Sequence, residues 1–330
     1  MLCYVLRLRL RHSYYAVPLT PATLAYLSTV GPTDFHSPLP QQRELREASA
    51  AALRLRTGVL PMRVVEDVSA PGGSMPLLRI FAPLEEDATQ PIILYAHGGG
   101  WVLSSVRTHD ELCRRLARAA RTTVISVEYR LSPEHAYPAA LDDMEEGYRF
   151  SAAKGRGVIL AGDSAGGNLA AGLALRLRDS AAPGPRALLL IYPALDASCS
   201  SESYSTFARG YGLTKQGMLF FWAAYLGGED RLSTAGAHAS PARAASVQGL
   251  PPTLTLVSQA DVLRDEGVQF HARLAAAGVH SELEVALGQV HGFIKRPNNP
   301  ESNLYLEALG ERIMRIAQRS SMGGTPSSII

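Results

Sequence analysis

Cysteine and net charge are both scarce in this sequence, and each scarcity argues against a class of protein. The 330 residues include only Cys3, Cys113 and Cys199, which are far apart and form no CxxC pair. This spacing disfavours a zinc site or a disulfide framework, and it favours a reducing compartment. The net charge of +2 gives no reason to expect nucleic acid or an anionic membrane as a partner.

Long apolar runs are also missing. No stretch reaches the roughly 18 apolar residues that a transmembrane helix requires. The first ten residues are apolar, but Arg7 and Arg9 interrupt them, so they make a poor signal peptide. We therefore expect a cytoplasmic protein without stable membrane insertion. Surface attachment through the first ten residues is the alternative.

Short apolar runs and helical patterns alternate from about residue 60 onward. The runs expected as strands are 62–68, 76–81, 91–96, 123–127, 158–161, 187–191, 253–257 and 282–286. The helical patterns between and after them are 110–120, 139–152, 165–178, 263–277 and 304–317. This alternation predicts an α/β fold with a mostly parallel sheet. Only residues 62–81 look antiparallel, with Pro71-Gly72-Gly73 as the turn.

Two segments do not follow this alternation of strands and helices. Residues 15–58 are expected to form helix and loop, and residues 198–240 contain dense aromatic residues but no strand pattern. We expect the second segment to be an insertion over one end of the sheet. Together with the amino-terminal segment it would cover an apolar pocket. An ordinary packed pair of helices is the alternative.

A candidate nucleophile lies between an expected strand and an expected helix. Gly162-Asp163-Ser164-Ala165-Gly166 matches the GxSxG elbow, in which a tight turn exposes the serine above the strand ends. Glycine at the two flanking positions avoids Cβ atoms that would clash. A phosphate loop fits poorly, because no Lys-Ser or Lys-Thr follows the glycines.

A second glycine-rich turn, HGGGW at residues 97–101, follows the strand expected at 91–96. Three consecutive glycines let backbone N–H groups face a cavity, as an oxyanion hole requires. We assign the donors to Gly99 and Gly100, with Ala165 as the third. His97 precedes the turn, and we expect it to brace the loop with Gly98 rather than act as a base.

A serine nucleophile needs an imidazole base and an acid that orients it. His291 follows the last expected strand, which we place at 281–287, inside a loop that leads to the last helix. The chain order of this kind of site is serine, acid, histidine. Asp261 is the first acid after the strand expected at 253–257, so we choose it. Asp265 and Glu266 lie one helical turn further on and are expected to be structural charges.

Taken together, these motifs resemble the hormone-sensitive lipase-like branch of the α/β-hydrolase superfamily, also called family IV of bacterial esterases. The likeness runs from about residue 60 to 317 and rests on HGGGW (97–101), EYRLSPEH (128–135), PAALDD (138–143), GDSAGGN (162–168), LIYP (190–193) and HGF (291–293). Two departures stand out. Val262 replaces the proline that usually follows the acid, and Gln289-Val290 replaces a turn that often contains methionine. We read Glu134, Asp142 and Asp143 as bracing residues, with Arg130 as a candidate partner.

The resemblance implies an eight-stranded core flanked by helices, a helical cap and hydrolysis of short- to medium-chain esters. The expected segments are an amino-terminal cap piece (1–59), a first core part (60–197), a cap insertion (198–240) and a second core part (241–330). No cofactor or metal is expected, and the partners would be a small ester and, in an oligomer, a second copy of the chain. Candidate residues of the substrate pocket are Trp101, Asp163, Tyr192, Phe207, Tyr211, Phe221 and Phe293.

Two other functions stay open at this point. An amidase, thioesterase or acyltransferase would use the same nucleophile on a specialised acyl group. A non-catalytic binder of the same fold is the second alternative, as in hormone receptors that resemble this family. Such receptors tend to lose a member of the triad, and all three candidate members are present here.

Overall fold

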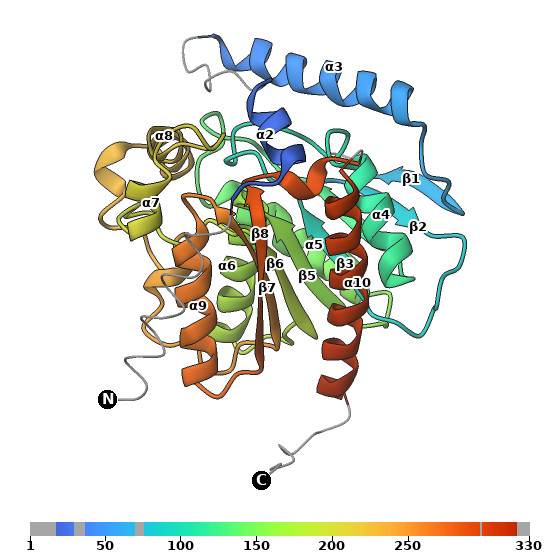
Figure 1. Ribbon diagram of the computed structural model, residues 1–330. Helices are drawn as coiled ribbons and strands as arrows, with labels where there is room; N and C mark the ends of the chain where they lie inside the picture. The colour runs from blue at the N-terminus through green and yellow to red at the C-terminus, as the bar shows by residue number, and fades with distance from the viewer. Residues whose placement is uncertain (1–17, 30–36, 70–75, 298, 322–330) are drawn as a thin grey trace.

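An eight-stranded sheet forms the centre of the computed structural model, which describes residues 18–29, 37–69, 76–297 and 299–321 (Figure 1). The strand order across the sheet is β1-β2-β4-β3-β5-β6-β7-β8. The strands are β1 Val64–Val68, β2 Leu77–Ala82, β3 Ile92–Ala96, β4 Val124–Glu128, β5 Val158–Asp163, β6 Ala187–Ile191, β7 Thr253–Ala260 and β8 Ser281–Val290. Each predicted strand is present, and the ends of most differ by only one or two residues.

The sheet is parallel except at one edge. β2 runs antiparallel to both β1 and β4, and every later pairing, from β3 with β4 to β7 with β8, is parallel. The antiparallel start was predicted for residues 62–81, although its expected turn, Pro71-Gly72-Gly73, lies outside the described residues. Because parallel strands share one carboxyl end, the loops after β3, β5, β7 and β8 meet at that edge.

Helices cover both faces of the sheet, and the strands alternate between the two cores. Ile93 and Tyr95 of β3 belong to the cluster formed with α4 and α10, whereas Leu94 and Ala96 belong to the cluster with α5, α6 and α9. This period of two is the geometry of a pleated strand buried on both faces. The helices are α4 Asp110–Ala120, α5 Ala139–Ala152, α6 Ala165–Asp179, α9 Arg264–Ala276 and α10 Pro300–Ser321.

Four further helices lie near the end of the sheet where these loops meet (Figure 1). They are α2 Pro21–Leu27, α3 Leu39–Thr57, α7 Glu202–Thr206 and α8 Lys215–Leu226. The helix predicted within 15–58 is therefore present as α2 and α3. α3 buries none of its side chains, and Leu45 on it is 59% exposed. Only Leu39, at its start, is a residue of this helix that packs partly buried against the main core cluster, so apolar packing contributes little to its position.

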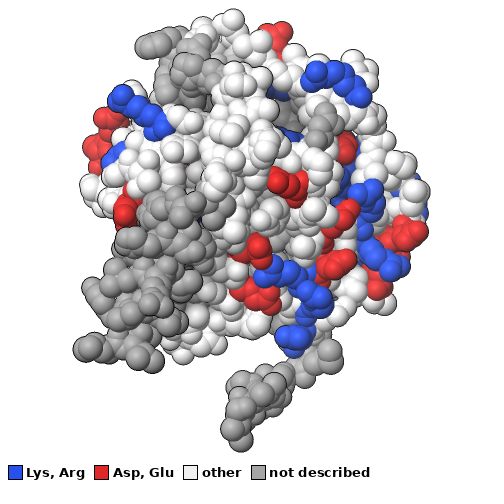
Figure 2. All heavy atoms as spheres, in the orientation of Figure 1, with Lys and Arg blue, Asp and Glu red and all other residues white. Residues whose placement is uncertain are grey.

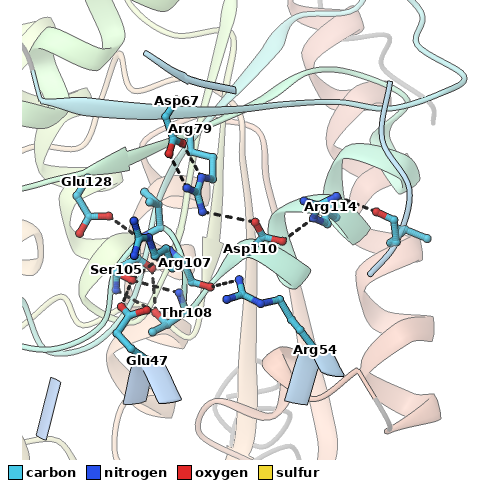
Figure 3. A network of polar contacts seen from close by, with 12 residues as sticks. Glu47, Arg54, Asp67, Arg79, Ser105, Arg107, Thr108, Asp110, Arg114 and Glu128 are labelled. Carbon is cyan, nitrogen blue, oxygen red and sulfur yellow. Dashed lines mark hydrogen bonds and ion pairs between the residues drawn. The ribbon is translucent and has the colours of Figure 1, made fainter. Parts of the chain in front are cut away.

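Polar contacts fix α3 instead. Figure 3 shows the side chains of Glu47 and Arg54 of α3 directed toward the segment that precedes α4. Ser105 donates its hydroxyl hydrogen to Glu47, and Arg54 Nη1 donates to the Arg107 carbonyl at 3.1 Å. The same network continues through Asp110 to Arg79 and Arg114. The amino-terminal helix is thus tied by charge to the segment that follows the HGGGW turn.

The surface carries charges of both signs. On the face seen in Figure 2, Lys and Arg side chains are interspersed with Asp and Glu rather than gathered by sign. Among the described helices, none is long and apolar enough to cross a membrane.

Candidate active site

Ser164 lies at the turn between β5 and α6, in the strained conformation that the elbow motif predicts. Its backbone has φ 58° and ψ −118°. A Cβ atom on Gly162 would lie 2.3 Å from the carbonyl carbon of Gly166, and one on Gly166 would lie 1.9 Å from the Ala96 oxygen. Both are backbone contacts that no side-chain movement can relieve, so glycine is required at both positions. The turn leaves Ser164 at the carboxyl edge of the sheet.

The structure brings Ser164, His291 and Asp261 together in one hydrogen-bonded line. Ser164 Oγ lies 3.0 Å from His291 Nε2 and donates to it, and His291 Nδ1 donates to Asp261 Oδ2 at 2.7 Å. Asp261 is buried, and its Oδ1 also accepts from the Leu263 backbone N–H at 3.0 Å. The carboxylate is therefore held in place from both sides, and it fixes which imidazole nitrogen faces the serine.

The strand before His291 is longer than predicted. β8 was expected to end at residue 287, but it runs to Val290, so the expected loop contains three strand residues. The ladder continues past an irregularity at Ser258 and Ala260, where Ala260 pairs with Val290. Gly288 makes this possible, because its φ of +69° suits the kink and its N–H donates to the Gln259 side chain. His291 is consequently positioned by the sheet itself.

Gln289, which replaces the more usual sequence before His291, has a structural role. Its buried side chain accepts from Thr23 Oγ1 of α2 at 3.0 Å and donates to Glu301 of α10. This departure ties α2 and α10 to the strand that carries His291. Val262, the other departure, leaves the Asp261 turn intact.

The HGGGW turn presents unused backbone donors beside Ser164. Gly99 has φ 134° and Gly100 has φ 65°, and the Leu103 N–H donates to the Gly99 carbonyl at 2.9 Å. Within the described part of the chain, the N–H groups of Gly99, Gly100 and Ala165 donate to no acceptor. Buried backbone donors are rarely left without a partner unless a ligand provides one. These are the three donors assigned from the sequence.

Asp163 supports this turn from below instead of lining a pocket, which corrects the prediction made for it. Its Oδ1 accepts from the Gly98 N–H and from the Tyr95 hydroxyl, both at 2.8 Å, and lies 3.3 Å from His109 Nε2. Burial alone would raise the pKa of Asp163, but His109 and the Tyr95 hydrogen bond hold it below its ordinary value. A buried carboxylate thus anchors the first glycine of the turn.

His97 is buried and neutral. Burial, assisted by the charge of His109, lowers the pKa of His97 to about 3. Its Nδ1 donates to the Gly98 carbonyl at 2.9 Å, its ring stacks on Tyr129, and its carbonyl accepts from the Tyr129 hydroxyl at 2.7 Å. These contacts fit the bracing role predicted for His97, and they keep its ring out of the line formed by Ser164 and His291.

The remaining pocket candidates divide into two groups. Tyr192 contacts His291, and the centroids of the two rings are 4.7 Å apart. Phe221 of α8 packs on Gly100 so closely that a Cβ there would lie 2.3 Å from the ring. By contrast, Trp101 stacks on Tyr225 in the core. Two further candidates, Phe207 and Tyr211, contact each other, and Phe293 packs on Tyr305.

The other acidic candidates make structural contacts. Asp143 pairs with Arg130 as suggested, whereas Glu134 pairs with Arg43 of α3 and Asp142 with Arg176 of α6. Asp265 accepts from the Ser203 N–H and Glu266 from the Asp196 N–H. In the described ranges, no group of three or more His, Cys, Asp or Glu side chains is arranged to hold a metal ion.

Replacing Asp163 with asparagine should reduce stability in a pH-dependent way. We expect the free energy of unfolding at pH 7 to fall by about 3 kcal/mol, because a buried carboxylate with three polar neighbours is lost. The folded-state pKa is depressed, so the wild-type contribution is present above about pH 4 and disappears as the pH falls below it. Urea unfolding of the wild type and the variant between pH 7 and pH 3 measures the difference in the free energy of unfolding. If that difference stays constant with pH, the prediction is wrong.

Several known proteins are similar to this chain in sequence or in fold. A family profile described as alpha/beta hydrolase fold matches residues 93–295. The carboxylic ester hydrolase LipN of Mycobacterium tuberculosis is 39% identical over 245 residues, which are 70% of this chain and 64%, just under two thirds, of LipN. Esterase LipI of the same organism is 38% identical over 72% of this chain and 78% of its own. The solved esterase of the archaeon Pyrobaculum calidifontis has a TM-score of 0.83 at 33% identity, covering 91% of this chain and 99% of that one.

Proposed function

The chain belongs to the α/β-hydrolase family, and from this premise we propose that it is a serine carboxylesterase acting on short- to medium-chain acyl esters. One observation carries the proposal. Three backbone N–H groups without an acceptor lie beside a serine whose hydroxyl is bonded to His291. A carbonyl oxygen that becomes an oxyanion next to Ser164 would supply that acceptor. The similarity to carboxylic ester hydrolases and esterases supports the same chemistry.

The acylation step uses each of these groups. Ser164 Oγ attacks the ester carbonyl carbon while His291 Nε2 takes the hydroxyl proton. The oxyanion accepts hydrogen bonds from the N–H groups of Gly99, Gly100 and Ala165. Collapse of the tetrahedral intermediate breaks the bond to the alcohol oxygen, which takes the proton from His291. Asp261 stabilises the imidazolium while it exists.

Deacylation repeats the cycle with water. A water molecule attacks the acyl carbon and gives a proton to His291 Nε2, and the same N–H groups hold the second oxyanion. When the intermediate collapses, the proton returns to Ser164 Oγ and the carboxylic acid leaves. The positive end of the α6 helix dipole adds to the stabilisation of both oxyanions.

We assign the helices beyond the sheet to a two-part cap. The segments are 1–59 and 198–240, and the core parts are 60–197 and 241–330. Contacts of α8 with Gly100 and of α2 with Gln289 support this division, since Gly100 lies in the HGGGW turn and Gln289 in the end of β8 that precedes His291. A cap in this position would exclude water from the oxyanion hole, where hydrogen bonds are then stronger.

Initial rates on matched substrates test the proposal. The purified protein is assayed with 4-nitrophenyl butyrate, butyryl 4-nitroanilide and a butyryl thioester, and it is labelled with a fluorophosphonate probe. We expect covalent labelling and a kcat/KM for the ester that exceeds the anilide value by orders of magnitude. Faster cleavage of the anilide or the thioester would identify an amidase or a thioesterase. Absence of both labelling and turnover would favour a non-catalytic binder.

Arg43 of α3 is expected to influence catalysis without touching substrate. Its Nε donates to the Val102 carbonyl at 2.8 Å, its Nη2 donates to the Ser132 carbonyl at 3.0 Å, and it forms a bidentate pair with Glu134. Substitution with alanine should therefore loosen the HGGGW turn. We expect kcat to fall by about tenfold, which corresponds to one or two charge-assisted hydrogen bonds, with a smaller change in KM.

The matched control is Arg149→Ala, because Arg149 makes only exposed ion pairs on α5. Thermal unfolding of both variants separates lost stability from a displaced turn. An Arg43→Ala protein with wild-type kcat would show that the hydrogen bonds of Arg43 do not position the HGGGW turn.

A further inference from the structure

Three cationic residues come from two segments near the candidate active site. Lys295 and Arg296 follow His291 by four and five residues, and Arg46 comes from α3. Within the described part of the chain, none of the three makes an ion pair with Asp or Glu. The arrangement differs from the surface in Figure 2, where charges of opposite sign alternate. Arg46 is exposed, whereas Lys295 and Arg296 are partly buried. Like charges that lie close together are destabilising unless an anion joins them.

Arg296 is oriented for an acceptor that approaches in the plane of its guanidinium. The Tyr26 ring of α2 covers one face of the group, with the ring centroid 3.2 Å from Cζ. Both terminal nitrogens, Nη1 and Nη2, are buried and have no hydrogen-bond partner among the described residues. Stacking on Tyr26 covers one face of the Arg296 guanidinium but leaves its N–H edge open. This edge is the one that binds a carboxylate in a bidentate manner.

A second buried donor without a partner lies close by. The Tyr192 hydroxyl is fully buried and makes no hydrogen bond in the described part of the chain. Burial raises the pKa of Tyr192 well above its usual value, and the charge of Arg296 acts in the opposite direction. The Tyr192 ring also contacts His291. Of these two buried donors without a partner, Tyr192 contacts the general base His291, and Arg296 follows His291 by five residues.

Lys295 and Arg46 add positive charge at this place. Burial lowers the pKa of the Lys295 ammonium, the Asp163 carboxylate raises it, and Arg46 and Arg296 lower it again. Asp163 is the carboxylate that acts on Lys295, since each shifts the pKa of the other toward the charged form, but among the described residues no ion pair joins the two. The Lys295 side chain folds back over Gly292, where a Cβ would lie 3.7 Å from Cε. Its charge thus stays next to the loop of His291.

We propose that Arg296 and the Tyr192 hydroxyl, with the charges of Lys295 and Arg46, form a subsite for a carboxylate on the ester substrate. This inference rests on the proposed function and narrows its substrates to anionic esters, such as monoesters of dicarboxylic acids. The carboxylate accepts from the guanidinium edge and from the phenol, and it balances the cluster of cations. Because the subsite adjoins His291, it lies within reach of either half of the ester.

Two pairs of esters identify the half that carries the charge. Mono(4-nitrophenyl) glutarate is compared with methyl 4-nitrophenyl glutarate, and 4-carboxyphenyl butyrate with its methyl ester. We expect one charged ester to exceed its neutral partner in kcat/KM by about tenfold or more, the value of charge-assisted hydrogen bonds. That ratio should fall about tenfold in Arg296→Gln and in Tyr192→Phe, and Arg149→Gln should keep it. The proposal would be overturned if each charged ester is cleaved more slowly than its neutral partner. It would also be overturned if Arg296→Gln leaves the ratio of charged to neutral kcat/KM unchanged.

A binding measurement separates this proposal from esterase activity itself. Glutarate at millimolar concentration should raise the Tm of the wild-type protein and of Arg149→Gln, but not that of Arg296→Gln. Lys295→Met serves as a second variant if Arg296→Gln does not fold, and it should weaken the shift. A shift in a protein that cleaves no ester would support the subsite and refute the esterase. Equal or absent shifts in wild type and variants would refute the subsite, whatever the turnover.

Discussion

Ser164→Ala is expected to lower kcat for 4-nitrophenyl butyrate by at least about 10⁴-fold, because the substitution removes the oxygen that would attack the ester carbonyl. The substitution keeps the Cβ atom and the positive φ of the elbow, so the turn is as strained as before. Stability should therefore change little. The oxyanion donors and the pocket stay in place and account for any residual rate over water.

Ser180→Ala is the matched control, since Ser180 lies at the opposite end of the same helix and its hydroxyl bonds only the Leu177 carbonyl. A fluorophosphonate should label wild type and Ser180→Ala with one equivalent and Ser164→Ala with none. His291→Gln should lose a similar factor, and the double variant should lose no more than the larger single effect, because the residues act as a unit. Turnover by Ser164→Ala above about 1% of wild type would exclude Ser164 as the nucleophile.

The elements whose evidence is local could be predicted from the sequence. α4 and α5 begin and end where the helical patterns do, at Asp110–Ala120 and Ala139–Ala152. The elbow turn was predictable because two glycines flank a serine between a strand and a helix, and the contact between Gly162 and Gly166 lies within five residues. Chain order then pointed to Asp261 and His291, which the structure brings within 3.0 Å of their neighbours.

The contacts that could not be predicted from the sequence join residues that are distant along the chain. Arg43 and Glu134 are separated by 91 residues, and Tyr95 and Asp163 by 68. No periodicity links such pairs, because only the folded sheet brings them together. The same limit explains the wrong end assigned to β8. A glycine usually signals the end of a strand, but Gly288 makes a kink inside one, held by the side chain of Gln259 on the neighbouring strand.

The pocket prediction failed for Asp163 for a related reason. Its neighbour along the chain, Ser164, is the residue that we propose as the nucleophile. Successive residues at the end of a strand point to opposite faces, however, so Asp163 is directed under the turn while Ser164 is directed above it. A buried carboxylate required buried donors, and the sequence did not indicate that Tyr95, Gly98 and His109 would provide that environment.

Gly99→Ala should have the second-largest effect on activity. A Cβ at Gly99 would lie 2.0 Å from the Leu103 carbonyl oxygen, and the φ of +134° is one that a residue with a side chain rarely adopts. The Leu103 carbonyl belongs to the turn that Gly99 closes through the Leu103 N–H, so the contact can be relieved only by moving backbone. Such a movement redirects the N–H groups of Gly99 and Gly100. We expect kcat to fall by about 10²- to 10³-fold, as when one oxyanion donor is lost, with a smaller change in KM.

Gly155→Ala provides the control for backbone strain. Gly155 also has a positive φ, of +75°, but no atom lies within 4 Å of the Cβ position. Alanine there should reduce stability by about 1 kcal/mol and leave kcat unchanged. The rate of phosphonylation at Ser164 gives an independent readout, because it too builds charge on an oxygen in the hole, so it should slow in Gly99→Ala alone. If Gly99→Ala retains kcat within threefold of Gly155→Ala, the oxyanion hole is built from other donors. In that case the unpaired N–H groups of the HGGGW turn serve substrate binding rather than the transition state.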